Sequence, residues 1–322
     1  MNPKEDFKYA VECKPPHNSI PLWELEFHLW EKFGGKGFYV GEEFLKLNTA
    51  EKDIALNKNA EIIAHVSEKL SFGAITIPGS YWELAPGIPA YWWLPEEDRL
   101  KQATILQRLI GNTIMLIANT GGVLGMPSAD NYINFAVSLC ETPEEIDEIA
   151  LKTFQKGIES VNKFAEAGIQ SFLTASDIAD NRGPYFNPEQ MERFILPYLE
   201  RWSAHIKQLS GLSILHSDGN LNLYLEQIIN SGVNALQAID PVAQMDIRKV
   251  KQQVGDKLCL CGNIDIGKLI TNSPESIYNE TKALLEFMKD KSGFILGASN
   301  AIQKEVPAEN YLALVKARIE FY

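Results

Sequence analysis

Apolar and polar positions along the chain repeat in one order: a short apolar or β-branched run, a polar turn, and a longer segment with helical spacing. Runs of the first kind predict buried strands, and the segments between them predict helices. The predicted strands are residues 19–28, 72–78, 113–119, 170–176, 213–216, 233–239, 257–263 and 293–297. This alternation indicates parallel strands joined by helical crossovers.

Prolines and glycines mark the ends of the predicted helices. Thr142 and Pro143 supply a cap and a first-turn proline for a helix over residues 143–167, which ends at Gly168. Asn-Pro and Ser-Pro pairs begin two further helices, over residues 187–209 and 273–289. The glycines that stand at a helix C-cap position before a strand are Gly211, Gly232 and Gly255.

Eight such strands in 322 residues predict an α/β fold, a (β/α)8 TIM barrel that residues 1–322 form as a single domain. A doubly wound dinucleotide-binding fold is disfavoured, because no Gly-rich fingerprint follows the first strand. The loops at the C-terminal ends of barrel strands carry the chemistry, so polar residues there are the candidates for function.

The composition of the chain indicates which classes of molecule it does not bind. A net charge of −12 argues against nucleic acid or an anionic membrane as the partner. The chain opens with a polar, Pro-rich stretch, and no apolar run approaches the roughly 20 residues that cross a bilayer. Its four cysteines are too scattered for a disulfide framework. We expect a cytoplasmic monomer or homodimer that acts on a small molecule.

The first predicted strand has two distinct faces. Alternation separates an apolar face from a polar one, the apolar residues being Trp23, Leu25, Phe27 and Leu29 and the polar ones Glu24, Glu26 and His28. Because the apolar face suits packing under helices, we expect Glu24 and Glu26 to point into the barrel and bind substrate. The alternative is a surface helix that begins near Glu26 and leaves both carboxylates in water.

Later strands end in acids, an imidazole and an amide. These residues are Asp177 with Arg182 in its loop, His216 and Asp218, Asp240, and Asn300. An acid after a strand can be a plain turn cap, and a His-x-Asp sequence is more often a hydrogen-bonded pair than a pair of metal ligands. We nevertheless expect them to converge, because the C-terminal ends of parallel strands lie at one face of a barrel.

Two further patterns have both a structural and a functional interpretation. Cys259 and Cys261 face the same way on the seventh strand. Free cysteines are among the most buried residue types, so a structural role in the core is favoured for this pair. Tyr81, Trp82 and the aromatic run at residues 91–93 lie in the long loop after the second strand. They either pack under this loop or form the wall of an aromatic substrate pocket.

Several segments resemble the uroporphyrinogen decarboxylase superfamily, in order and at suitable spacing. They are SDIADNRGPYFNPEQMERFILPYLERW at 176–202, HSDGNL at 216–221, AIDPVAQMDI at 238–247, CGNIDIGKL at 261–269 and GFILGASNAI at 293–302. The likeness spans about residues 22–317 and implies the same (β/α)8 barrel.

The decarboxylases of this superfamily act on a tetrapyrrole with many carboxylates. Resemblance to them implies an Arg-rich motif near the N-terminus and an Asp at the end of the second strand. This chain has no arginine before Arg99, and its second strand ends in Ile77, Pro78, Gly79 and Ser80. A substrate with many carboxylates needs several guanidinium partners, so decarboxylation of uroporphyrinogen is the less favoured function.

The chain is more similar to the corrinoid-dependent methyltransferase branch, which implies a corrinoid carried by a partner protein and a zinc site. The ligands of that site are His-x-Cys after strand five, an acid after strand six and a Cys in the strand-eight loop. The matching positions are His216, Asp218, Asp240 and Asn300, so both cysteines are replaced, by Asp218 and Asn300.

Oxygen ligands in place of thiolates make a bound zinc, or a harder divalent metal ion, more Lewis acidic and suit an oxygen leaving group. Without a metal, His216 paired with Asp218 acts as a general acid, and Asp177 completes the predicted catalytic set. We therefore predict a methyltransferase that moves a methyl group from a small, O-methylated donor to a corrinoid protein. The alternatives are a uroporphyrinogen decarboxylase-type enzyme and a non-catalytic barrel that binds a small ligand.

Overall fold

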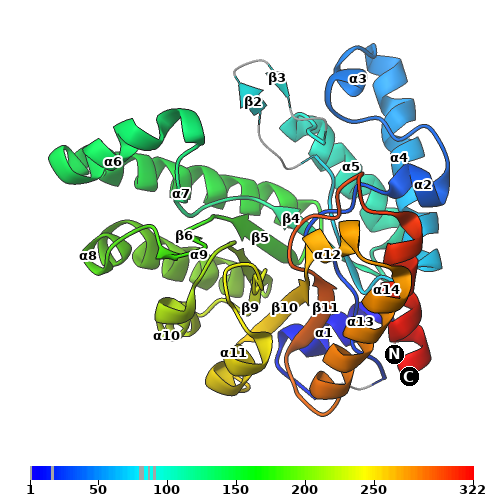
Figure 1. Ribbon diagram of the computed structural model, residues 1–322. Helices are drawn as coiled ribbons and strands as arrows, with labels where there is room; N and C mark the ends of the chain where they lie inside the picture. Colours follow the sequence, from blue (N-terminus) through cyan, green and yellow to red (C-terminus); the bar gives the residue numbers. More distant parts are fainter. Residues whose placement is uncertain (1, 16–17, 80–82, 86–87, 90–91) are drawn as a thin grey trace.

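The computed structural model describes residues 2–15, 18–79, 83–85, 88–89 and 92–322. At its centre is a curled, seven-stranded parallel sheet whose spatial order follows the chain (Figure 1). Its strands are β1 (Ala74–Thr76), β4 (Met115–Asn119), β5 (Ser171–Ala175), β8 (Leu212–His216), β9 (Ala235–Gln237), β10 (Cys259–Ile264) and β11 (Phe294–Ala298). The seven strands predicted from residue 72 onward are therefore confirmed, with ends shifted by at most two residues.

Helices surround this sheet and two short antiparallel pairs lie in its loops (Figure 1). The pairs are β2 (Glu83–Ala85) with β3 (Ile88–Pro89), and β6 (Ala179–Asp180) with β7 (Gly183–Pro184). The α-helices are α1 (Pro3–Val11), α2 (Trp30–Gly34), α3 (Gly41–Leu45), α4 (Thr49–Lys69), α5 (Glu96–Ile110), α6 (Tyr132–Glu141), α7 (Pro143–Glu166), α8 (Pro188–Gln190), α9 (Leu196–Gln208), α10 (Leu225–Asn230), α11 (Ile247–Val254), α12 (Ile266–Thr271), α13 (Pro274–Met288) and α14 (Ala308–Phe321). Among the described helices, none is both long and apolar enough to cross a bilayer.

The predicted helix ends agree with the structure except in one segment. Helix α7 has Thr142 as its N-cap and Pro143 in its first turn, and Gly168 follows its end with φ +86°. The segment predicted as one helix over residues 187–209 is instead α8, a π-helical turn at Met191–Ile195, and α9. The π-turn ends two residues before Pro197, which has no N–H to continue the α-helical hydrogen bonds.

Apolar side chains form separate layers on the two sides of the sheet. Along β4, Met115 and Ile117 belong to one buried cluster, while Leu116 and Ala118 belong to another that includes the outer helices. The first cluster combines α1 with residues from every strand of the sheet, so it fills the inside of the curl. Cys259 and Cys261 lie in this inner layer, as the structural interpretation of the pair expects.

The first predicted strand is the main departure from the prediction. Instead of a continuous strand over residues 19–28, the chain makes isolated parallel bridges from Leu22 to Leu296 and from Phe27 to Ile302. Trp23 N donates to Leu296 O at 3.0 Å, and Gly73 N donates to Leu22 O at 2.8 Å. This segment therefore lies between β11 and the start of β1, hydrogen-bonded toward both ends of the sheet.

The predicted faces of this segment are also wrong. Trp23 and Leu25 lie in the inner apolar cluster rather than under the helices, whereas Phe27 and Leu29 lie in the outer cluster. A continuous strand would keep these alternate side chains on one face. The break in pairing between the two bridges removes that constraint, so the face changes between Leu25 and Phe27.

Glu24 fastens this segment to the rest of the fold and does not face the barrel interior as predicted. Its Oε2 accepts a hydrogen bond from Ala298 N at 2.8 Å, and its Oε1 accepts one from the Tyr311 hydroxyl of α14 at 3.0 Å. Burial raises the pKa of Glu24 to about 8, although both hydrogen bonds oppose the shift. Glu24 therefore joins the first segment, β11 and α14.

The raised pKa of Glu24 predicts a pH dependence of stability. A carboxyl with a higher pKa in the folded chain than in the unfolded chain favours folding at low pH, and this contribution is lost as pH rises through about 8. Glu24→Gln should therefore flatten the fall in unfolding free energy between about pH 5 and pH 8 by roughly 1.4 kcal/mol per pH unit. Urea denaturation over this pH range measures the slope.

Glu68→Gln is the matched control, because Glu68 is an exposed residue of α4. Its slope should equal that of the wild type. Equal slopes for Glu24→Gln and the wild type would show that Glu24 is ionised in the folded chain.

Candidate functional site

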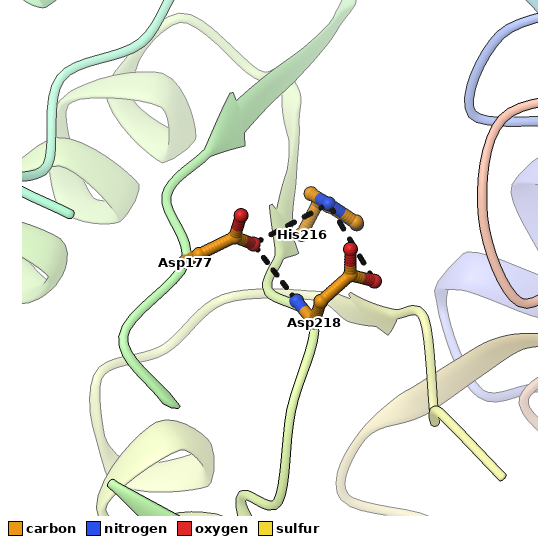
Figure 2. Close-up of side chains that lie close together, drawn as sticks. All are labelled: Asp177, His216 and Asp218. Carbon is orange, nitrogen blue, oxygen red and sulfur yellow. Dashed lines mark hydrogen bonds and ion pairs between the residues drawn. The ribbon is translucent and has the colours of Figure 1, made fainter. Parts of the chain in front are cut away.

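Three side chains from two neighbouring strand ends point toward one another (Figure 2). Asp177 follows β5, His216 ends β8, and Asp218 lies two residues after His216. His216 Nε2 lies 3.6 Å from Asp177 Oδ1 and 4.0 Å from Asp218 Oδ1. One donor atom of each residue lies within 4.8 Å of the other two. The structure thus brings together the three residues predicted as the catalytic set.

Hydrogen bonds between the two loops fix this arrangement. Asp218 N donates to Asp177 Oδ1 at 2.9 Å, and Ile178 N donates to Ser217 Oγ at 3.1 Å. Gly219 has φ +89°, and a Cβ atom there would lie 2.4 Å from Ala179 O. The close approach of the loops therefore requires a glycine at this position.

Gln237 orients the imidazole of His216. In the parallel register of β8 and β9 the two residues are partners, and His216 Nδ1 lies 2.5 Å from Gln237 Oε1. Gln237 Nε2 donates to Ala298 O at 3.2 Å, which assigns Oε1 as the acceptor for the imidazole. Nδ1 therefore carries the proton of the neutral ring, and the Nε2 lone pair faces Asp177 and Asp218.

Asp218 is the most perturbed member of the group. Its Oδ2 accepts a hydrogen bond from Asn300 Nδ2 at 2.6 Å, whereas its Oδ1 is buried without a hydrogen-bond partner in the described part of the chain. Burial raises the pKa of Asp218 to about 6; the neighbouring His216 opposes this shift, and the charges of Asp177 and Asp240 add to it. Asp218 can therefore gain or lose a proton near neutral pH.

The group forms one side of a cavity of about 1060 Å³. The lining residues are Leu25, Glu26, His28, Trp92, Arg99, Asn119, Thr120, Gly121, Ala175, Asp177, His216, Asp218, Asn300, Ala301, Gln303, Lys304 and Glu305. Ligand pockets usually measure about 300–1,000 Å³, so this cavity has room for a small substrate and part of a second reactant.

A second polar pair lines the same cavity. Glu26 Oε2 lies 2.6 Å from His28 Nε2, and the His28 ring lies against Trp92 with 4.3 Å between centroids. Burial raises the pKa of Glu26 well above its ordinary value and lowers the pKa of His28 to about 3. Burial therefore disfavours the charged form of both members of the pair. The alternative of a solvated Glu26 on a surface helix is wrong.

Asp240 and Asn300, which were predicted as metal ligands, make contacts of their own beside this group. Asp240 stands outside the group, and its Oδ1 accepts a hydrogen bond from Val242 N at 2.9 Å. The preceding Ile239 has φ +52°, which turns the chain away from the extended direction of β9. Asn300 directs its amide nitrogen at Asp218, while its own oxygen accepts from Ala301 N at 2.6 Å, so it supports Asp218 as a donor.

The predicted substrate-binding residues are distributed over several places. Glu26 lines the cavity, while Glu24 is engaged between β11 and α14 as described above. Arg182 is exposed and lines a shallower hollow of about 550 Å³, whose wall also includes Asp177 and Asp218. Tyr81 and Trp82 lie outside the described residues.

Two residues of the site were missed by sequence reasoning. Gln237 lies in a buried strand, and the signal that could have found it is its position beside His216 in the parallel register. Arg99 lies in the first turn of α5 and reaches the cavity wall. Nothing in the local pattern distinguishes it from a surface arginine of an amphipathic helix.

The arrangement can hold a divalent cation or move a proton. Around a tetrahedral ion with bonds of about 2.1 Å, ligand atoms stand roughly 3.4 Å apart. The separations of 3.6 and 4.0 Å from His216 Nε2 to the two carboxylates are close to this value. The partnerless Asp218 Oδ1 and the free Nε2 lone pair complete a donor set that fits such an ion. The same Nε2 is placed to give or take a proton.

Comparison with known proteins identifies related chains. A family model described as uroporphyrinogen decarboxylase (URO-D) matches residues 100–321. Uroporphyrinogen decarboxylase of Ruthia magnifica subsp. Calyptogena magnifica is 26% identical over 229 residues, covering 68% of this chain and 63% of that protein. Methylcobamide:CoM methyltransferase MtaA of Methanosarcina barkeri is 24% identical over 228 residues, covering 69% of this chain and 63% of that protein. This chain therefore spans less than two thirds of the length of either relative.

A solved structure shares the fold over the whole chain. The methyltransferase from Methanosarcina mazei superposes with a TM-score of 0.68 at 17% identity, covering 100% of this chain and 99% of that one. Decarboxylases and a methyltransferase are thus similar to this chain at nearly equal identity. Overall similarity therefore does not distinguish decarboxylation from methyl transfer, and the residues of the candidate site must distinguish them.

The hydrogen bond from His216 to Gln237 predicts a single imidazole tautomer. Gln237→Leu removes the acceptor for Nδ1–H and should produce a mixture of the two neutral tautomers, whereas the wild type should show Nδ1–H alone. Long-range proton–nitrogen correlation spectra of imidazole-labelled protein above about pH 8, where an ordinary imidazole is neutral, measure this ratio. A wild-type ring protonated at Nε2 would contradict the assignment.

Proposed function

This chain belongs to the uroporphyrinogen decarboxylase (URO-D) family, and within it we propose a methyltransferase that moves a methyl group from a small O-methylated donor to a corrinoid protein. The observation that carries the proposal is the convergence of His216, Asp177 and Asp218 on one cavity. The printed name of the Methanosarcina barkeri relative, Methylcobamide:CoM methyltransferase, supports a methyl transfer that involves a corrinoid, although in that protein the corrinoid is the methyl donor.

His216 supplies the proton that the leaving oxygen needs. As the methyl carbon bonds to the nucleophilic acceptor, the carbon–oxygen bond breaks and its electron pair stays on the oxygen. A protonated His216 gives its Nε2 proton to that oxygen, while Nδ1–H stays on Gln237. Asp177 and Asp218 flank Nε2, with oxygens 3.6 Å and 4.0 Å from it.

As an alternative to this proton transfer, His216, Asp177 and Asp218 would be the residues that hold a divalent metal ion, with the Nε2 lone pair free of a proton. When bound, such an ion acts as a Lewis acid toward the oxygen of the donor. Carboxylate ligands favour a harder ion than the thiolates of the related zinc sites would. We propose that Asn300 keeps Asp218 in place through its amide donor, and that Asp240 acts on the group through its charge alone.

Decarboxylation of uroporphyrinogen is the rival reaction, because relatives with that printed name match this chain. The described residues that line the cavity include two basic side chains, Arg99 and Lys304, whereas several acids stand among them. A substrate with many carboxylates would meet more negative than positive charge there. A non-catalytic binding barrel is the second rival, and it has no need for an oriented imidazole.

We also propose that residues 1–322 form one barrel domain. The segment through Leu22 takes the eighth position, since it hydrogen-bonds to Leu296 on one side and to Gly73 on the other. Of the aromatic residues predicted to form the wall of a substrate pocket, Trp92 lies in the described part of the chain and lines the cavity.

Metal binding gives the first test. We expect zinc, manganese or cobalt(II) to bind with one ion per chain, and His216→Ala to abolish that binding. Affinity should rise as pH increases through about 6, because the proton on Asp218 competes with the ion. Isothermal titration calorimetry measures both effects. His65→Ala is the control, since His65 is exposed on α4.

Methyl transfer gives the second test. With methoxylated donors and free cob(I)alamin as acceptor, the wild type should form methylcobalamin, detected by its absorption spectrum. His216→Ala and Asp218→Asn should lower the rate by about 10²–10⁴-fold, the usual contribution of a positioned general acid. Uroporphyrinogen should give no coproporphyrinogen.

Coproporphyrinogen production by the wild type at ordinary enzyme levels would make the decarboxylase correct. Absence of metal binding together with unchanged methyl transfer in His216→Ala would remove the proposed role of this residue. Absence of both reactions with every donor would favour the binding barrel.

A further inference from the structure

Arg99 is a cationic side chain in the cavity wall that forms no ion pair with a described carboxylate. It lies in the first turn of α5, and its Nη2 donates to Asn119 O at 2.7 Å. Its Nε is buried without a hydrogen-bond partner, and no described carboxylate lies within ion-pair distance of the guanidinium. The nearby Glu96 instead pairs with Lys163 at 2.7 Å.

A purely structural role does not account for this arginine. Its guanidinium lies over the Phe164 ring at 5.1 Å, and the bond to Asn119 uses one of five N–H donors. Burial lowers the pKa of Arg99 to about 10, so the side chain is still charged at neutral pH. A buried charge without an ionic partner is costly, whereas a guanidinium facing a ligand cavity can be compensated by an anion there.

The position of Arg99 relative to His216 defines the shape of such a ligand. Asn119 ends β4 and His216 ends β8, with β5 between them in the sheet. Two strand spacings correspond to roughly 10 Å across the mouth of the barrel. Ala175, which ends β5, and Trp92, whose ring packs against His28 and Phe38, also line this cavity. A ring-sized planar molecule with a polar group at each end fits this span.

We propose that Arg99 binds a carboxylate of the substrate, so that the molecule in the cavity is a small aromatic carboxylate. Its opposite end lies at His216, where the proposed function places the methoxy group. The position of the methoxy group at His216 rests on the proposed function, whereas the binding of the carboxylate by Arg99 does not. An Arg–carboxylate pair is strong and directional because two parallel N–H donors match two oxygens.

Binding of benzoate, 4-methoxybenzoate and the neutral benzamide tests the anchor without any methyl acceptor. We expect the wild type to bind both carboxylates and to bind benzamide at least tenfold more weakly. Arg99→Gln should weaken carboxylate binding by about 10–100-fold while leaving benzamide unchanged, as expected for loss of a charge-assisted pair of about 1.5–3 kcal/mol. Arg99→Lys, which keeps the charge, should lose less.

Arg108→Gln is the matched control, because Arg108 is an exposed arginine on the same helix. It should bind all three ligands like the wild type. Thermal unfolding of each variant separates a lost anchor from a lost fold, and Arg99→Lys retains the test if Arg99→Gln does not fold. Equal binding of benzoate and benzamide, carboxylate binding that survives Arg99→Gln, or no binding of either carboxylate at millimolar concentration would each overturn the proposal.

The same ligands separate this proposal from the proposed function. Carboxylate binding that depends on Arg99, without methyl transfer from 4-methoxybenzoate or any other donor, would keep the anchor and overturn the methyltransferase. Methyl transfer from 4-methoxybenzoate whose KM is unaffected by Arg99→Gln would keep the methyltransferase and overturn the anchor.

Discussion

The hydrogen bonds of residues 21–23 are the constraint on which the rest of the structure depends. A parallel sheet has unpaired N–H and C=O groups along both edges, and these need partners when they are buried. Leu296 N donates to Pro21 O at 2.9 Å on one side, and Gly73 N bonds to Leu22 O on the other. This segment hydrogen-bonds toward both ends of the curled sheet, one apolar cluster lies on the inner side of the curl, and the C-terminal strand ends that carry Asp177 and His216 line a common cavity.

Most of the fold could be predicted from the sequence because the strands from residue 72 onward are continuous apolar runs. A run of that kind has one solution, a strand buried on both faces, and turn residues mark its ends. The prediction for residues 19–28 was wrong because it assigned alternate positions to two faces. That assignment holds only for an extended chain without breaks. The bridges at Leu22 and Phe27 are separate, and this bend is set by contacts with β11 and β1 that are distant in sequence.

The candidate site could be predicted only in part. His216, Asp177 and Asp218 follow directly from their positions at strand ends. Asp240 occupies an equivalent position, but the positive φ of Ile239 redirects the chain, and a backbone angle of this kind leaves no trace in a hydrophobic pattern. Gln237 and Arg99 depend on strand register and on helix packing respectively, so they become visible only when distant segments are placed side by side.

The cavity wall contains buried polar atoms that have no hydrogen-bond partner among the described residues, namely Asp218 Oδ1, Glu26 Oε1 and Arg99 Nε. An unsatisfied buried group of this kind destabilises a folded chain by about 1–3 kcal/mol. Apolar residues of similar size at these three positions would make the fold more heat-resistant and leave it unable to recognise a polar ligand. Selection for thermal robustness and selection for recognition therefore act in opposite directions on the same few side chains of this barrel.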